Sequence, residues 1–217
     1  MFYQTSRTNM IKQQLRTGGV LQEAILSLFD EIPREEFVPA AFKAFAYSDT
    51  RIVLPHQQVM MTPLEEATVL QALMLNGTET VLEVGTGSGF FTALLSRLCK
   101  QVISVDCFAD LTTNAQLTLA KHQCLNVDLI TGNAALGWVD KAPYDVVVFT
   151  GALPELTETH RLQVLPGGRL FALVGTYPIM KSALHQLDHF GFWHSKELFE
   201  TSLPPLISHR EPTDFVF

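Results

Sequence analysis

The chain has 217 residues, of which 47% are hydrophobic and 17% charged, and its formal net charge at pH 7 is −7. This length fits one domain with a sizeable core, and the acidic balance, with no basic cluster, excludes nucleic acid and anionic membranes as main partners. With no run of eighteen apolar residues and no basic-then-apolar leader, we expect a cytoplasmic protein, either a monomer or a weak homodimer.

The first 78 residues carry a helical pattern. Apolar spacing predicts helices over residues 6–17 and 21–29, and a proline-bounded segment follows at 32–39. We expect this extension to pack over the ligand-binding edge of the domain, as a lid or an acceptor platform. The run Thr62-Pro63-Leu64-Glu65 predicts a capping box, with threonine at the N-cap, proline at the first helical position and glutamate at N3.

Short apolar strands alternate with helical segments from residue 79 to 175. We predict helices over residues 88–99, 109–122 and 158–164, and strands over residues 81–84, 101–106, 127–131, 144–149 and 170–174. This alternation predicts an α/β fold, a mostly parallel twisted sheet with helices on both faces. Ligands of such sheets bind beyond the carboxyl ends of the strands.

The last segment, residues 176–217, completes what we expect to be a single domain. Residues 179–188 and 192–201 flank Gly191 and predict an antiparallel hairpin, and the apolar stretches 203–206 and 214–217 are expected to dock. His185, His189 and His194 lie in strand-like surroundings that do not suit helical metal-ligand spacing, so we predict exposed histidines and no metal site. The three cysteines are scattered and show no C-x-x-C spacing, which also argues against a metal site.

The most informative motif follows the first predicted strand, with Glu83 ahead of glycines at 85, 87 and 89. A dinucleotide loop would place glycine where Phe90 stands, and a nucleoside-triphosphate loop would need a lysine. What remains is a tight turn that lets backbone approach a ligand, at a helix N-terminus that holds an anion. The carboxylate of an amino-acid-like ligand suits such a site, and S-adenosylmethionine has one.

Polar residues follow the next three strands as well. Asp106 ends the second strand, 21 residues after Gly85, and an acid at this place accepts both hydroxyls of an adenosine ribose. Gly132 and Asn133 follow the third strand, where an asparagine oxygen can accept from the adenine amino group. Thr150 follows the fourth strand. These motifs together predict an adenosine-containing ligand.

With these motifs placed, the chain resembles the protein-L-isoaspartate O-methyltransferase family over nearly its whole length. The resemblance is carried by residues 10–16, 32–39, 47–49 leading to Gln58 and Pro63, 81–89, 132–138 and 165–170. The N-terminal segments are more specific than the glycine loop, which all class I methyltransferases share. The resemblance implies a Rossmann-like class I methyltransferase fold of about seven strands with an N-terminal helical extension.

The resemblance also implies a reaction. S-adenosyl-L-methionine would donate a methyl group to the α-carboxylate of an L-isoaspartyl residue in a damaged protein or peptide, leaving S-adenosyl-L-homocysteine. The ester would close to a succinimide, which reopens partly as normal aspartate. The residues implied to bind the cofactor are Glu83, Gly85, Thr86, Gly87, Gly89, Asp106, Gly132, Asn133 and Thr150.

The acceptor loop departs from the family. The family's run is roughly G-Q-T-I-S-x-P, whereas this chain has Val59 in place of the threonine and Met61 in place of the serine. We expect Met61 and Thr62 to line the acceptor side, with the Thr62 hydroxyl occupied by the capping box. A carboxylate is already ionised at neutral pH and needs no general base. Losing a hydroxyl that orients the acceptor carboxylate would lower the rate of methyl transfer by about 10²-fold, while the site for the methyl donor would remain.

Three functions therefore stay open. The match outside the loop favours an isoaspartyl methyltransferase. The apolar loop favours a methyltransferase with a different, more apolar acceptor, for which His56 is the candidate base, or a non-catalytic relative that binds the cofactor. A nicotinamide dehydrogenase is less well supported than these three functions, because Phe90 stands where a dinucleotide loop has glycine and because Glu83 precedes the glycines.

Overall fold

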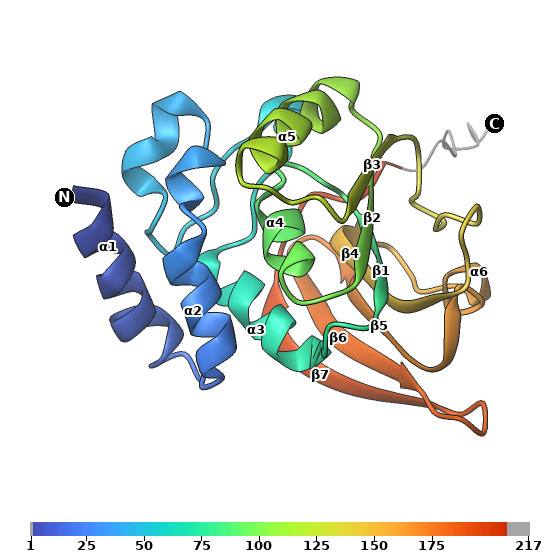
Figure 1. Cartoon of the computed structure of the whole chain (residues 1–217). Coiled ribbons are helices and arrows are strands. Elements are labelled where there is room, and N and C mark those ends of the chain that lie inside the picture. Colours follow the sequence, from blue (N-terminus) through green and yellow to red (C-terminus); the bar gives the residue numbers. More distant parts are fainter. Residues whose placement is uncertain (1, 208–217) are drawn as a thin grey trace.

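The computed structural model describes residues 2–207. A seven-stranded sheet with the order β3-β2-β1-β4-β5-β6-β7 forms its centre (Figure 1). Strands β1 to β5 run parallel, and β6 and β7 are antiparallel. The strands are β1 Thr80–Val84, β2 Gln101–Asp106, β3 Val127–Thr131, β4 Tyr144–Leu153, β5 Val164–Thr176, β6 Ile179–Leu187 and β7 Trp193–Thr201. The predicted sheet and the predicted C-terminal hairpin are confirmed.

Helices occupy most of the places that the apolar spacing predicts, and α3 follows the predicted capping box. They are α1 Phe2–Met10, α2 Glu23–Glu31, α3 Pro63–Leu73, α4 Phe90–Ser96, α5 Ala109–Lys121 and α6 Glu158–Arg161, with a π-helical turn at Ile11–Leu15 and 3₁₀ turns at Arg34–Glu36, Ala40–Phe45 and Pro55–Gln57. Within residues 2–207, none of them has the length and apolar character needed to cross a membrane. The N-terminal helices α1 and α2 form the predicted helical extension: α1 packs against α2, and α2 packs against α3, which lies between them and the sheet (Figure 1).

The two faces of the sheet are covered unequally. Val81 points into a core that it shares with α2, α3, α4 and α5, whereas its neighbour Leu82 points into a second core with Ala134 and Val164. Successive strand residues face opposite sides, so β1 contributes to both. The second face carries one helix among the described residues, α6. The helix predicted over 158–164 is a single turn because Val164 already belongs to β5.

Strand β4 runs further than predicted and brings the C-terminal segment to the ligand edge. It continues past Phe149 to Leu153 through an irregularity between Val148 and Ala152. There the Ala152 N–H donates to the Pro204 carbonyl at 3.0 Å, and the Leu206 N–H donates to the Ala152 carbonyl at 2.9 Å. The predicted docking of 203–206 is confirmed, and the stretch 214–217 lies outside the described residues.

The predicted capping box starts α3 directly after the acceptor loop. Thr62 Oγ1 accepts from the Glu65 N–H at 3.3 Å, and Glu65 Oε2 accepts from the Thr62 N–H at 2.9 Å. Two N–H groups that a helix start leaves without partners are thereby satisfied. The cap fixes where the helix begins, and so fixes the loop that carries Met60 and Met61.

Candidate active site

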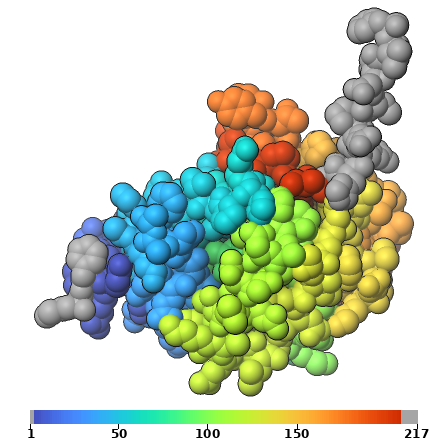
Figure 2. All heavy atoms as spheres, turned by 90° about the horizontal axis from the view of Figure 1, so that it is seen from above, coloured from blue at the N-terminus to red at the C-terminus, as the bar shows by residue number. Residues whose placement is uncertain are grey.

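Two adjoining pockets lie at the carboxyl ends of β1, β2, β3 and β4. Gly85, at the start of the glycine loop, lines both pockets. Segments far apart in the sequence meet here, and Figure 2 shows the cyan loop of residues 50–60 beside the green start of α5 and the red segment 203–207. The two pockets therefore adjoin at the glycine loop.

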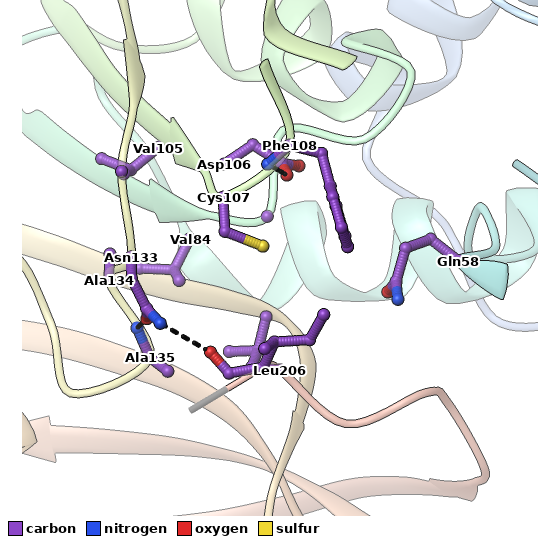
Figure 3. A pocket seen from close by; sticks show the side chains of 13 residues that line it. Gln58, Val84, Val105, Asp106, Cys107, Phe108, Asn133, Ala134, Ala135 and Leu206 are labelled. Atoms are coloured by element: carbon purple, nitrogen blue, oxygen red, sulfur yellow. Dashed lines mark hydrogen bonds between the residues drawn. The ribbon is translucent and has the colours of Figure 1, made fainter. Parts of the chain in front are cut away.

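Four of the predicted residues line the first pocket: Gly85, Asp106, Gly132 and Asn133. Cys107, Phe108 and Leu206 are among the other residues that line it (Figure 3), and the sequence analysis had not singled out Phe108 or Leu206. Phe108 and Leu206 supply apolar walls, while Asp106 supplies a carboxylate. Leu206 reaches the pocket only because its segment pairs with the end of β4.

Asp106 ties the glycine loop to the end of β2. Its Oδ2 accepts from the Gly87 N–H at 2.9 Å, and its Oδ1 accepts from the Phe108 N–H at 3.0 Å. Burial raises the pKa of Asp106 above its ordinary value, and the two N–H bonds work against that rise. Each oxygen has a further lone pair, so a pair of ligand hydroxyls can bind this carboxylate.

Asn133 is used differently from the sequence prediction. Its Oδ1 accepts from the Ala135 N–H at 3.0 Å, and its Nδ2 donates to the Ile207 carbonyl at 2.9 Å (Figure 3). The side chain thus holds the loop after β3 against the C-terminal segment. Its oxygen, which we expected to meet an adenine amino group, already receives one N–H and keeps a single lone pair for a ligand.

The second pocket lies between the glycine loop and the acceptor loop. It is lined by Gly85, Thr86 and Gly87 of the glycine loop and by Met60 and Met61 of the acceptor loop, together with Thr150 and Glu66. Gly85 has φ +103° and Gly87 has φ +54°, a backbone conformation that glycine adopts without steric cost. A Cβ on Gly85 would clash with the Thr150 hydroxyl, which donates to the Val84 and Gly85 carbonyls.

Three predicted residues lie outside both pockets. Thr62 is occupied by the capping box. Gly89, with φ +80°, caps α4 and packs against Ala115. Glu83 is fully buried beside α4, where one oxygen accepts from the Thr92 hydroxyl at 2.6 Å and the other has no hydrogen-bond partner within the described chain. Glu83 therefore supports the loop from beneath.

Glu83 makes the stability of the fold depend on pH. Burial raises the pKa of Glu83 to about 8, whereas an unfolded glutamate has a pKa of about 4.3. Between these values the folded state keeps a proton that the unfolded state has lost. The free energy of unfolding therefore falls as pH rises from 5 to 8, by up to about 1.4 kcal/mol per unit.

Replacing Glu83 with glutamine keeps the side chain's size and removes its titration. We expect Glu83→Gln to flatten the loss of stability between pH 5 and 8, measured by urea unfolding at pH 5, 6.5 and 8. Some slope should remain, because burial also raises the pKa of Glu66, to about 7. An identical slope in the variant and the wild type would contradict the assignment.

Arg34 holds the acceptor loop from behind. It is fully buried, and it donates to the Met61 carbonyl at 2.7 Å, to the Ala46 carbonyl at 3.0 Å and to Glu66 Oε2 at 3.2 Å. Its guanidinium also lies over the Phe90 ring. Arg34 belongs to the 32–39 segment that the sequence marked as distinctive, although the sequence assigned it no role.

His56 joins the acceptor loop to the start of α5. Its backbone has φ +59°, its ring stacks on Phe108 with centroids 3.9 Å apart, and its Nε2 lies 2.8 Å from Asp110 Oδ1. It lines neither pocket. The position of His56 therefore gives no support to the prediction that it acts as a base. Its ring instead packs on Phe108, which lines the first pocket.

The order of the sheet, the glycine loop after β1 and the acid after β2 define the Rossmann-like methyltransferase fold. Two solved structures share it. A protein-L-isoaspartate O-methyltransferase aligns with a TM-score of 0.78 at 24% identity, over 93% of this chain and 66% of that one. A Plasmodium falciparum protein described by the same activity, in complex with S-adenosyl-L-homocysteine, aligns with a TM-score of 0.79 at 16% identity. The alignment covers 94% of this chain and 98% of that one.

The sequence comparisons identify the family. The sequence model of the protein-L-isoaspartate(D-aspartate) O-methyltransferase family matches residues 5–198 of this chain. The protein-L-isoaspartate O-methyltransferase of Koribacter versatilis is 36% identical over 94% of this chain and 91% of its own. That of Trichlorobacter lovleyi is 34% identical over 80% of each chain. This chain belongs to the protein-L-isoaspartate O-methyltransferase family.

Proposed function

We propose that the protein is an S-adenosylmethionine-dependent O-methyltransferase that acts on the carboxylate of L-isoaspartyl residues in damaged proteins and peptides. The observation that carries this is a pair of adjoining pockets: a pocket with the Asp106 carboxylate adjoins, at Gly85, a pocket lined by the acceptor loop. Membership of the family supports the same reaction.

The residues present fit the cofactor. Asp106 would hold the two ribose hydroxyls, and the apolar walls Phe108 and Leu206 would enclose the base. The glycine loop, followed by the N-terminus of α4, would hold the α-carboxylate, because loop N–H groups and the helix dipole favour an anion. Once bound, the cofactor supplies an electrophilic methyl group on a sulfonium.

The chain's own contribution to catalysis is position. An isoaspartyl carboxylate is ionised at neutral pH, so none of the lining side chains has to remove a proton. The acceptor loop has to hold the carboxylate in line with the methyl group, and such alignment supplies several kcal/mol. Arg34 fixes this loop through the Met61 carbonyl, while Met60 and Met61, each 5% exposed, keep water out.

The direct test is methyl transfer from labelled S-adenosylmethionine to an isoaspartyl peptide, with the aspartyl peptide of the same sequence as the control. We expect label in the isoaspartyl peptide alone. Equal labelling of both peptides would show a different specificity. No labelling of either, in a protein that binds S-adenosylhomocysteine in calorimetry, would point to another acceptor or to a non-catalytic role.

Restoring the missing hydroxyl should raise activity. In Met61→Ser, a hydroxyl faces the second pocket and donates a hydrogen bond to the acceptor carboxylate. We expect kcat/KM for the isoaspartyl peptide to rise by roughly 10- to 100-fold, measured under identical conditions. Met60→Ser, one place earlier in the loop, is the matched control. An unchanged rate for Met61→Ser would show that the loop no longer holds an isoaspartyl carboxylate.

One observation favours a second candidate, a methyltransferase for a more apolar acceptor. Beside Met60 and Met61, the second pocket is lined by Leu54, Val59 and Phe91, and a buried carboxylate needs hydrogen bonds that these side chains do not give. Label appearing in neutral, hydroxyl-bearing apolar molecules and not in isoaspartyl peptide would select this candidate.

We also propose that the protein works in the cytoplasm as a monomer or weak homodimer, without a nucleic-acid or membrane partner. The three cysteines Cys99, Cys107 and Cys124 are free thiols, as expected in a reducing compartment. The net charge of −7 opposes binding to nucleic acid and to anionic lipid. Light scattering across a concentration series tests the oligomeric state.

A further inference from the structure

Glu66 brings a charge into a pocket that is otherwise uncharged. Among the described residues that line the second pocket, it has the one side chain that ionises. It is 2% exposed and lies on α3, one residue after the capping-box glutamate. Burying a carboxylate is costly unless it is paired, so the groups that surround Glu66 decide what it can bind.

Arg34 pairs with both carboxylate oxygens of Glu66. Its Nε donates to Glu66 Oε2 at 3.2 Å, and its second terminal nitrogen donates to Oε1 at 3.4 Å. Arg34 itself does not line the pocket. A carboxylate oxygen accepts more than one hydrogen bond, so each Glu66 oxygen can accept another from the pocket side.

The glycine loop lines the same pocket and forms another of its walls. Gly85, Thr86, Gly87 and Ser88 present the glycine loop there, and α4 begins directly after it. The Gly85 and Gly87 N–H groups already donate to the Val105 carbonyl and to Asp106, which leaves the N–H groups of Thr86 and Ser88 to donate to an anion. A ligand part that satisfies both walls carries a negative group toward the loop and a positive, hydrogen-donating group toward Glu66. The zwitterionic end of an amino acid has this form.

We propose that Glu66 binds the α-ammonium group of the cofactor's methionine part, and so makes the site specific for a cofactor with an intact amino-acid end. This inference rests on the proposed function, since it assumes that the cofactor binds along the glycine loop. Glu66 is then a binding residue for the donor, and the acceptor carboxylate meets the uncharged side of the pocket formed by Met60 and Met61.

The test compares two ligands by calorimetry at pH 8. S-adenosylhomocysteine carries the amino-acid end, and 5′-methylthioadenosine has the same nucleoside without it. In Glu66→Gln, we expect the Kd for S-adenosylhomocysteine to rise roughly 10- to 100-fold, the usual range for losing a hydrogen bond to a charged group. The Kd for methylthioadenosine should stay within about twofold, because the first pocket is unaltered.

Glu65→Gln is the matched control. It removes the same charge one residue away, in a side chain that does not line either pocket, and glutamine still completes a capping box. Both affinities should stay at the wild-type value. Equal losses for both ligands in Glu66→Gln would show a general distortion and overturn the proposal, as would an unchanged affinity for S-adenosylhomocysteine.

Glu66→Gln leaves Arg34 buried without a counter-charge, so a second variant guards against misfolding. Arg34→Met/Glu66→Met replaces the pair by apolar side chains, a change that buried ion pairs tolerate. We expect it to show the same selective loss of S-adenosylhomocysteine. If the wild type binds neither ligand, the proposed function falls and this inference falls with it. Unaltered binding in both Glu66 variants overturns this inference alone.

Discussion

Replacing Asp106 with alanine is expected to weaken the binding of S-adenosylhomocysteine by about 100-fold or more while the fold stays intact. Two ribose hydroxyls would each lose a hydrogen bond to a charged acceptor, and each such bond contributes roughly 1.5–3 kcal/mol. The Gly87 and Phe108 N–H groups would lose their acceptor as well, so the glycine loop becomes less ordered. Calorimetry measures the affinity, and thermal unfolding checks the fold.

Asp110→Ala is the matched control for this variant. Asp110 is an exposed carboxylate four residues further on, paired with His56, and it lines neither pocket. We expect its removal to change the affinity by no more than about twofold, since exposed ion pairs contribute little. Wild-type affinity in Asp106→Ala would remove the ribose site from the end of β2.

Replacing Arg34 with methionine is expected to lower the free energy of unfolding by about 3–5 kcal/mol, the usual cost of breaking a buried ion pair from one side. Arg34 is fully buried, and the change leaves the Glu66 carboxylate and two backbone carbonyls, of Ala46 and Met61, without their donor. Urea unfolding measures the loss.

The second substitution separates charge from shape. In Arg34→Met/Glu66→Met neither charge is left, so most of the lost stability should return. Arg16→Met is the control at an exposed pair, Arg16 with Glu23, 44% and 70% exposed, where we expect less than about 1 kcal/mol. A double variant as unstable as Arg34→Met would show that the hydrogen bonds to Ala46 and Met61, and not the ion pair, stabilise this region.

Periodicity was enough to predict the sheet and the edge that carries the site. Val81 and Leu82 alternate between two cores, and the strand ends place Gly85, Asp106 and Gly132 together, because carboxyl ends of parallel strands share an edge. The capping box at Thr62 was also readable, because it depends only on neighbours three residues apart. Predictions of this kind rest on local rules.

Contacts between segments that are far apart in the sequence could not be predicted in the same way. Leu206 becomes a pocket wall because β4 extends to Leu153 and pairs with residues after Pro204. The roles of Asn133 depend on Ile207 in the same way. Glu66 left a signal that sequence reasoning missed: it lies four and seven residues before the buried Leu70 and Leu73, on the face of α3 that packs inward.

The proposed activity is repair of isoaspartyl peptides, and following the peptide itself measures this activity without an intermediate readout. An isoaspartyl peptide is incubated with the protein and S-adenosylmethionine, and the isoaspartyl and aspartyl forms are separated chromatographically over time. We expect the isoaspartyl form to decline and the aspartyl form to accumulate through the succinimide, only when the donor is present. An isoaspartyl peptide that stays unchanged with the donor present, in a protein that binds S-adenosylhomocysteine, would contradict the claim.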